Sequence, residues 1–121
     1  MTKRILVVDD ENSIRTLYRD ELLDEGYDVD TANNGKMALE ALSRGSYDLI
    51  ILDISMPELN GLEFIGKVRE VNMELPIVIC TAFGTFKQDL AAWGADDYIV
   101  KSSDLTELKT RVKALLERKE P

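Results

Sequence analysis

The 121-residue sequence contains no histidine, and this absence excludes several kinds of chemistry. Catalytic triads of serine, histidine and aspartate need an imidazole, and so do the common zinc sites. Phosphohistidine cannot form within the chain either. A histidine that takes part in its chemistry must therefore come from a partner.

Cysteine and long apolar runs are also scarce. Cys80 is the only cysteine, so no disulfide forms within the chain, which agrees with a reducing compartment. It lies inside the apolar run PIVICT and is expected to be a buried small hydrophobic residue. The apolar patch near the amino terminus is too short for a signal peptide, and no run approaches the ~18–20 residues of a membrane span. We expect a cytoplasmic protein that does not associate with membranes.

Positive charge is in deficit, with 15 basic residues against 23 acidic ones and a formal net charge of −8. The nucleic-acid backbone requires a basic surface, so this domain is not expected to bind nucleic acid directly. The remaining composition, 45% hydrophobic and 31% charged, is that of a globular protein. Because repeats, low-complexity tracts and linkers are absent from the sequence, residues 1–121 are predicted to form a single domain.

Short apolar runs alternate with amphipathic patterns along the chain. This alternation predicts a five-stranded parallel sheet with helices on both faces. The strands are expected at 4–8, 27–32, 48–53, 76–81 and 97–101, and the helices at 13–26, 36–43, 62–71, 86–93 and from about 104 onward.

Two helices have more detailed patterns. In the first, the apolar face is expected to consist of Ile14, Leu17, Tyr18 and Leu22. In the last, Asp104 and Glu107 have the spacing of a capping box. The apolar stripe that follows consists of Leu105, Leu108, Val112 and Leu115.

Strand composition also indicates which strand lies at an edge. The runs ILVV, LIIL and IVIC are apolar on both faces, as central parallel strands are, whereas YDVDT alternates apolar residues with aspartate. Placing this second strand outside the first gives the order 2-1-3-4-5, in which ligands bind beyond the strand ends between strands 1 and 3.

Three carboxylates lie at that point: Asp9 and Asp10 end the first strand, and Asp53 ends the third. Each pair of charges at ~4 Å repels by about 4 kcal/mol at an effective dielectric near 20, so the cluster must take up protons or bind a cation. Oxygen ligands without histidine or cysteine favour Mg²⁺, Mn²⁺ or Ca²⁺, and a site with few protein ligands is typical of Mg²⁺.

Two further polar residues end strands at the same edge, Thr81 on the fourth and Lys101 on the fifth. A hydroxyl and an ammonium beside a bound cation suit an oxyanion such as a phosphoryl group. Each residue alone is a weak signal, because strand ends often carry a threonine or a solvated lysine. Their joint presence with the acidic cluster favours a functional site.

These motifs together resemble the receiver (CheY-like) domain of two-component response regulators across essentially the whole chain. The resemblance is carried by Asp9-Asp10, Asp53 followed by ISMPELNG, Thr81-Ala82, and Tyr98 three residues before Lys101. It implies a flavodoxin-like, doubly wound fold, so the strand order given above is not independent of it.

The resemblance also implies a function, that of a phosphoacceptor switch rather than an enzyme. Asp53 would accept a phosphoryl group from a partner's phosphohistidine, in a phosphorelay that requires Mg²⁺. Asp10, Asp53 and the backbone carbonyl of Ser55 would bind this ion, with Asp9 supporting it. Lys101 and Thr81 would hold the phosphoryl oxygens, and Thr81 with Tyr98 would change the output face.

The implied partners are a sensor histidine kinase or a histidine phosphotransfer protein, together with a downstream protein target. The kinase is expected to dock near the first helix and the loop after the fifth strand, with exposed residues such as Arg15 and Arg19 influencing its choice. Because no effector domain follows the last predicted helix, the chain is either a single-domain regulator or the excised receiver of a longer one.

The sequence departs from the receiver pattern in two places. Receivers usually have proline after the active-site lysine, joined through a cis peptide, but Lys101 is followed by Ser102-Ser103. A cis bond before serine costs about 2.5–4 kcal/mol, so this peptide is expected to be trans or strained. The segment from Thr81 to Lys101 is also a couple of residues short, which predicts a short fourth helix.

Three other functions are open to a chain with these residues. A haloacid-dehalogenase-type hydrolase also uses a strand-end aspartate, but Ser55 stands where its second aspartate belongs. A flavodoxin-like electron carrier would bind a flavin phosphate at the first strand end, where Asp9 and Asp10 would repel it. The remaining alternative is a pseudo-receiver, a protein-interaction module that acts without phosphorylation.

Overall fold

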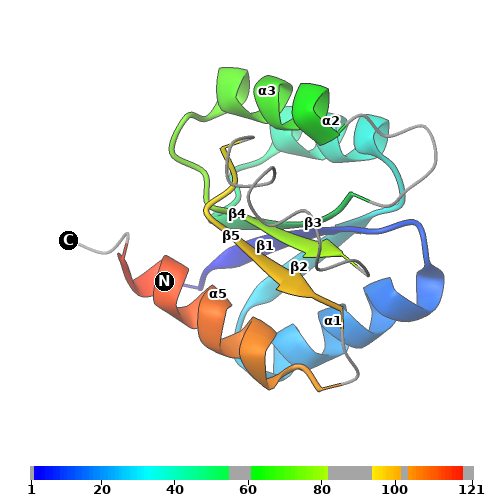
Figure 1. The fold of residues 1–121 in the computed structure, drawn as a ribbon, viewed down its shortest axis with the longest axis vertical. Coiled ribbons are helices and arrows are strands. Elements are labelled where there is room, and N and C mark those ends of the chain that lie inside the picture. The colour runs from blue at the N-terminus through cyan, green and yellow to red at the C-terminus, as the bar shows by residue number, and fades with distance from the viewer. Residues whose placement is uncertain (1, 55–60, 82–93, 102–103, 119–121) are drawn as a thin grey trace.

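The computed structural model describes residues 2–54, 61–81, 94–101 and 104–118. Strands and helices alternate along the chain, as the apolar periodicity predicts (Figure 1). The strands are β1 (Arg4–Val8), β2 (Asp28–Ala32), β3 (Leu49–Asp53), β4 (Ile77–Thr81) and β5 (Asp97–Val100), and the helices are α1 (Asn12–Asp24), α2 (Gly35–Arg44), α3 (Gly61–Val71) and α5 (Thr106–Arg118). The helix expected at 86–93 lies outside the described residues.

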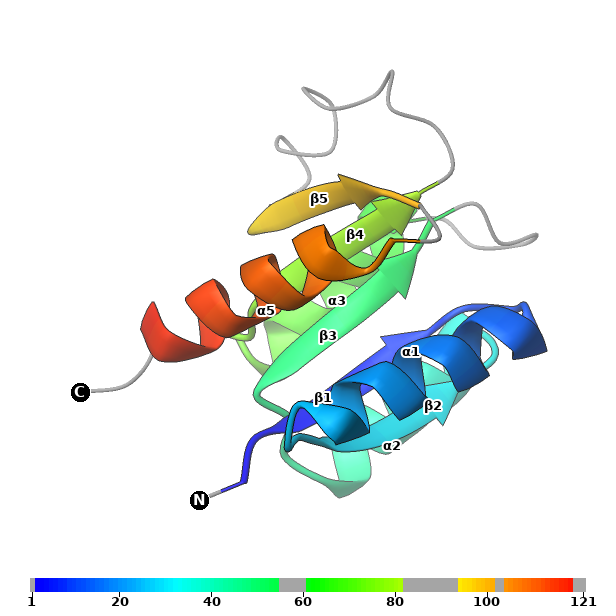
Figure 2. The same ribbon diagram turned by 90° about the horizontal axis from the view of Figure 1, so that it is seen from below.

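The five strands form one parallel sheet in the order β2-β1-β3-β4-β5, which confirms the predicted topology. Figure 2 shows the strand arrows pointing the same way, so their carboxyl ends meet along one edge of the sheet. Every residue of β3 and β4 is buried, whereas β2 alternates between exposed and partly buried residues before it ends in the buried Ala32. The apolar central runs and the mixed edge strand therefore take the positions that their composition predicts.

The helices cover the sheet in two layers, with α2 and α3 on one face and α1 and α5 on the other (Figure 1). Alternate residues of a strand point to opposite faces, and each layer has its own buried cluster. Leu6 and Ile50 belong to the cluster under α2 and α3, whereas Ile5 and Ile51 belong to the one under α1 and α5. Among the described residues, the structure has no helix that is both long and apolar enough for a membrane span.

The prediction for the first helix is wrong for one residue. Tyr18 and Leu22 are buried and Ile14 is packed against them, but the side chain of Leu17 is 38% exposed. Ile14, Tyr18 and Leu22 follow the four-residue spacing of one stripe, and Leu17 lies about 100° around the helix from Tyr18. The sheet buries only this narrow stripe of α1.

The apolar stripe predicted for the last helix is confirmed, whereas the reciprocal bonds of a capping box between Asp104 and Glu107 stay a prediction. Asp104 Oδ1 accepts hydrogen bonds from the N–H of Thr106, at 2.9 Å, and from its hydroxyl group. These bonds satisfy a donor at the start of α5 and define where the helix begins. All four residues of the predicted apolar stripe are buried, namely Leu105, Leu108, Val112 and Leu115.

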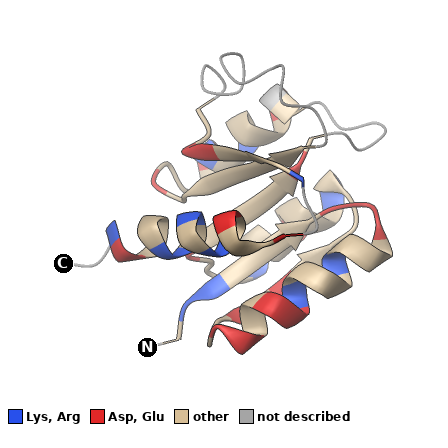
Figure 3. Cartoon of the chain, turned by 60° about the horizontal axis from the view of Figure 1, so that its bottom comes forward, with Lys and Arg blue, Asp and Glu red and all other residues tan. Residues whose placement is uncertain are grey.

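Helices α1 and α5 both carry charged residues of both signs, as Figure 3 shows. One pair joins the two helices, since Lys109 Nζ of α5 lies 2.7 Å from Glu21 Oε2 of α1. Both side chains are partly exposed, and surface pairs contribute about 0–1 kcal/mol each. The apolar clusters beneath, rather than these pairs, hold the helices to the sheet.

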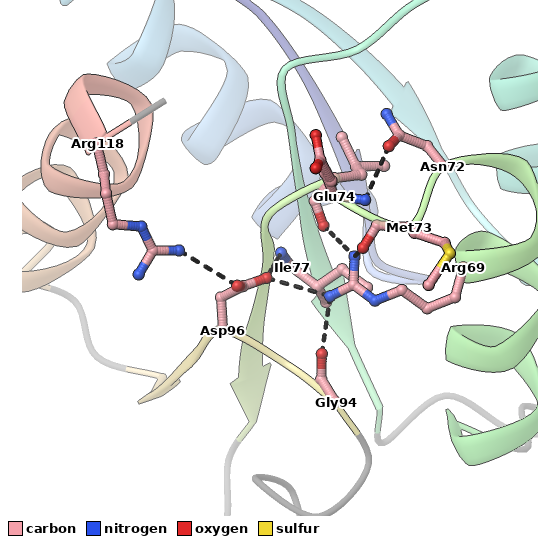
Figure 4. A network of polar contacts seen from close by, with 9 residues as sticks. Arg69, Asn72, Met73, Glu74, Ile77, Gly94, Asp96 and Arg118 are labelled. Carbon is pink, nitrogen blue, oxygen red and sulfur yellow. Dashed lines mark hydrogen bonds and ion pairs between the residues drawn. The ribbon is translucent and has the colours of Figure 1, made fainter. Parts of the chain in front are cut away.

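A polar network closes the end of the sheet at which β4 and β5 begin (Figure 4). The Arg69 guanidinium of α3 donates to the carbonyls of Leu75 and Gly94, and it lies 3.2 Å from Asp96 Oδ2. Asp96 also accepts the N–H of Ile77 at 2.8 Å. This network connects α3 to the first residues of β4 and to the turn before β5.

Candidate functional site

The polar residues predicted to end strands do lie along one edge of the sheet. Asp9 directly follows β1, Asp53 ends β3, Thr81 ends β4 and Lys101 directly follows β5. The strand register aligns them, since Asp53 pairs with Cys80 and the N–H of Lys101 donates to the carbonyl of Thr81 at 2.7 Å. The parallel topology therefore brings together residues that lie up to 92 positions apart in the sequence.

Three carboxylates form the centre of this edge. One oxygen from each of Asp9, Asp10 and Asp53 lies within 4.8 Å of the others. Asp9 and Asp53 are only 2% and 3% exposed, whereas Asp10 is exposed. The two buried carboxylates thus lie below the surface at the carboxyl edge of the sheet, and the carboxylate of Asp10 contacts solvent.

The ammonium of Lys101 lies between the two buried carboxylates. Its Nζ is 2.9 Å from Asp9 Oδ2 and 3.1 Å from Asp53 Oδ2. Burial favours the neutral amine, but the hydrogen bonds and charges of Asp9 and Asp53 outweigh it and raise the pKa of Lys101. The sequence predicts this lysine near the acidic cluster but gives no sign that it offsets part of the repulsion there.

Asp9 is the most constrained of the three carboxylates. Its Oδ1 accepts the N–H of Glu11 at 2.9 Å, and its own N–H donates to the carbonyl of Ala32. Burial raises the pKa of Asp9, and the Glu11 N–H and the Lys101 ammonium oppose that rise only in part. This carboxyl group is therefore costly to ionise even with the Lys101 ammonium 2.9 Å away.

Two contacts near the site were not predicted. The Arg15 guanidinium donates to the backbone carbonyl of Asp9 at 2.7 Å and so attaches α1 to the loop that carries the acidic pair. Beneath the rim, the hydroxyl of Tyr18 lies 3.8 Å from the Cys80 sulfur. Burial raises the pKa of the Cys80 thiol to about 11, so this cysteine is a buried core residue as expected.

The donor set of the acidic cluster fits a hard divalent cation. The described part of the cluster offers carboxylate oxygens alone, which suit Mg²⁺ better than a transition metal. Few protein ligands leave room for water and a phosphate oxygen, as Mg²⁺ requires. Ser55, whose backbone carbonyl was predicted to be a ligand, lies outside the described residues.

Thr81 and Tyr98 differ in their surroundings. Thr81 is 2% exposed at the end of β4, one residue beyond the register partner of Asp53. Tyr98 lies in β5, partly buried against the apolar cluster under α2 and α3. Ser102, and with it the peptide bond that follows Lys101, lies outside the described residues.

This arrangement suits the transfer of an oxyanion to a carboxylate. Asp53 can act as a nucleophile, and the Lys101 ammonium is placed to stabilise charge on an incoming oxygen. The neighbouring carboxylates can hold the cation that a phosphoryl group requires. Among the described residues, no other group of three potential metal ligands has this geometry.

Comparison with known proteins agrees with this chemistry. The family model of the response regulator receiver domain matches residues 5–113. The transcriptional regulatory protein PcoR of Escherichia coli is 42% identical over 96% of this chain and 52% of its own length. The response regulator ArlR of Staphylococcus saprophyticus is 44% identical over 98% of this chain and 54% of its own. The chain spans about half the length of these curated relatives.

Solved structures include similar proteins of the same size. The response regulator TrrA of Thermotoga maritima in complex with Mg²⁺ and BeF is 50% identical, with a TM-score of 0.87 over 94% of this chain and 99% of its own. TrrA bound to the histidine kinase ThkA has a TM-score of 0.86, over 95% and 99% of the two chains. The chain belongs to the response regulator receiver domain family, whose members are signalling domains rather than classical enzymes.

Proposed function

We propose that this chain is a phosphoacceptor switch of a two-component system, formed by residues 1–121 as one domain, with Asp53 as the acceptor. The observation that carries the proposal is the position of Asp53 at the strand edge. There its buried carboxylate lies 3.1 Å from the Lys101 ammonium and within 4.8 Å of two other carboxylates. Among the described residues, three acidic groups of this cluster lie around one lysine ammonium, so their negative charge is only partly offset.

The proposed reaction is phosphoryl transfer to a carboxylate. An Asp53 oxygen attacks the phosphorus of a partner's phosphohistidine, forming an O–P bond as the P–N bond breaks. The histidine nitrogen leaves with the bonding electrons, and the product on Asp53 is an acyl phosphate. Since the chain has no histidine, the donor imidazole must belong to the partner.

Asp10 and Asp53, with the backbone carbonyl of Ser55, would hold Mg²⁺, and Asp9 would support it. When bound, this ion neutralises the acidic cluster and reduces the charge on the phosphoryl oxygens. The donor set of the described carboxylates supports this assignment.

Lys101 and Thr81 are proposed to receive the phosphoryl oxygens. The Lys101 ammonium already lies against the acceptor, so it can contact an oxygen of the new phosphate with little movement. Thr81 would donate its hydroxyl, and Tyr98 would turn inward as Thr81 moves. Shifting a two-state equilibrium from 1:99 to 99:1 takes about 5.5 kcal/mol, which a few charge-assisted hydrogen bonds can supply.

The proposed upstream partner is a sensor histidine kinase or a histidine phosphotransfer protein. The complex of TrrA with the histidine kinase ThkA supports this class of partner, at 50% identity to this chain. Docking at α1 would place Arg15 and Arg19 at the contact. The downstream target is a protein, and the proposed compartment is the cytoplasm, which the buried free thiol of Cys80 supports.

The proposal is tested by intact-mass spectrometry after incubation with acetyl phosphate, in Mg²⁺ or in EDTA. We expect a phosphoryl adduct on the wild type in Mg²⁺, its loss in EDTA, and its loss in Asp53→Ala. Asp20→Ala, which removes an exposed carboxylate of α1, is the matched control and should retain the adduct. An adduct that persists in Asp53→Ala would overturn the choice of acceptor.

The pseudo-receiver alternative predicts a different result. If the chain acts without phosphorylation, the folded wild type forms no adduct with acetyl phosphate or with a phosphohistidine donor. The hydrolase and electron-carrier alternatives are set aside, because the family of this chain consists of signalling domains.

A further inference from the structure

The exposed edge of the sheet formed by β2 contains a basic groove, whose lining residues include none of the acidic cluster. It has a volume of about 540 Å³ and runs along β2, between α1 and the end of α2. Its lining includes three of the 15 basic side chains, Arg4, Arg19 and Arg44, but only one of the 23 acidic ones, Asp30. A local excess of arginine is unexpected on a chain whose net charge is −8.

Two of the lining residues hold Arg4 in one position. Its guanidinium lies 2.8 Å from Asp30 Oδ2 and stacks 4.8 Å above the centre of the Tyr47 ring, whose hydroxyl donates to Asp30 at 2.7 Å. Gly45 leaves the space this requires, because a Cβ at that position would lie 3.2 Å from Arg4 Nη1. The polar wall of the groove is thus ordered before any ligand binds.

The other two arginines have donors to spare. Within the described residues, the Arg44 guanidinium has no hydrogen bond or ion pair. In the described part of the chain, Arg19 pairs with Asp20 alone, at 3.4 Å between two exposed side chains. Exposed pairs contribute about 0–1 kcal/mol, so a stronger anion can displace Asp20 at little cost.

We infer that this groove, lined by Arg4, Arg19, Arg44 and Tyr47, binds a compact phosphate-bearing anion at the edge of β2. Planar guanidinium groups donate two parallel hydrogen bonds to phosphate oxygens, which a lysine cluster does not. The volume falls within the range of about 300–1,000 Å³ typical of small-molecule sites. The groove is separate from the phosphoacceptor site and shares none of its residues.

The inference is tested by titrating the ¹⁵N-labelled full chain with inorganic pyrophosphate and following amide shifts by NMR. EDTA is present and NaCl keeps the ionic strength constant, so that neither metal binding nor screening contributes. We expect saturable shifts at Val29, Thr31 and Gly45. Loss of one charge-assisted contact in Arg44→Gln or Arg19→Gln should raise the Kd about ten-fold.

Lys113→Gln is the matched control, because it removes one exposed charge from α5, outside the groove. Shifts that never saturate, or a Kd that rises equally in Lys113→Gln, would overturn the inference. Tighter binding of tetraglutamate than of pyrophosphate at the same amides would overturn the assignment to phosphate. Phosphorylation of Asp53 should be unchanged in Arg44→Gln, so the groove and the phosphoacceptor function fail independently.

Discussion

The two ends of the same sheet contain similar charged residues, but the negative charge is offset by cations at one end and only partly offset at the other. At the amino end, the Asp96 carboxylate faces Arg69, Arg118 and the N–H of Ile77 (Figure 4). At the carboxyl end, one ammonium, that of Lys101, serves both Asp9 and Asp53, and Asp10 lies beside them. In the described part of the chain, one carboxylate forms ion pairs with two cations at the first end, whereas three carboxylates lie around one ammonium at the second.

This difference separates a structural site from a reactive one. A balanced network satisfies its polar groups within the chain and stabilises the fold. An excess of carboxylates is unfavourable until a cation or a phosphoryl group arrives, which makes the carboxyl end responsive to ligands. The effects of substitutions at the carboxyl end should therefore depend on metal and on pH, whereas those at the amino end should be the same with and without metal.

The largest effect on stability is expected from Asp96→Ala. The substitution leaves Arg69 and the N–H of Ile77 without their shared acceptor in a site where the Asp96 side chain is 25% exposed. We expect the free energy of unfolding in urea to fall by about 2–4 kcal/mol, equally in Mg²⁺ and in EDTA.

Asp24→Ala is the control for this prediction, because Asp24 lies at the exposed end of α1. It should change the free energy of unfolding by no more than about 0.5 kcal/mol. A loss in Asp96→Ala as small as that of the control would show that the amino-end network does not stabilise the fold.

A smaller effect is expected from Lys101→Met at the carboxyl end. Removing the ammonium exposes Asp9 and Asp53 to their mutual repulsion, so the free energy of unfolding in EDTA should fall by about 1–3 kcal/mol at pH 7. The loss should shrink at pH 5, where Asp9 takes up a proton more readily. Lys113→Met, at an exposed position of α5, is the control, and a loss that grows on acidification would contradict the interpretation.

The fold was predictable because its signals are local. The central strands are continuous apolar runs. In β2, Asp28 and Asp30 alternate with other residues, which indicates that this strand lies at an edge of the sheet. The order of the strands also drew on the resemblance to receiver domains. Leu17 was misplaced because periodicity shows which residues share a side of a helix but not how wide a stripe the sheet covers.

The candidate site was predictable to the extent that topology places it. Parallel strands end at one edge of the sheet. The sequence alone therefore predicts that Asp9, Asp53, Thr81 and Lys101 lie there. Which carboxylate Lys101 would contact could not be predicted, because side-chain geometry at the rim decides it. The contact between Arg69 and Asp96 joins residues 27 positions apart that belong to no sequence motif, so nothing in the sequence indicated it.

The third effect is the response to Mg²⁺. An ion bound by the folded state alone stabilises it by RT ln(1 + [L]/Kd), which is about 1.4 kcal/mol at ten times the Kd. We expect this gain in the wild type and in Asp96→Ala, but not in Asp10→Asn, which loses a proposed ligand. Thermal unfolding with and without Mg²⁺ measures this gain in stability, with Asp20→Asn as the control at an exposed position. A gain in Asp10→Asn equal to that of the wild type would exclude Asp10 as a ligand.

The smallest effect is a pH dependence that belongs to the carboxyl end. Burial raises the pKa of Asp9 above its ordinary value of 3.8, so the folded protein keeps this proton at a pH where the unfolded chain has lost it. The free energy of unfolding should therefore decrease as pH rises from about 3.8 through the raised value. Asp9→Asn, which can still accept the Glu11 N–H, should remove this decrease. Urea titrations of both proteins in EDTA from pH 4 to pH 7, with Asp20→Asn as the control, measure the difference. If the stability of the wild type rises relative to that of Asp9→Asn across this range, the Lys101 ammonium outweighs burial at Asp9. The charges at the carboxyl end would then be as balanced as those at the amino end.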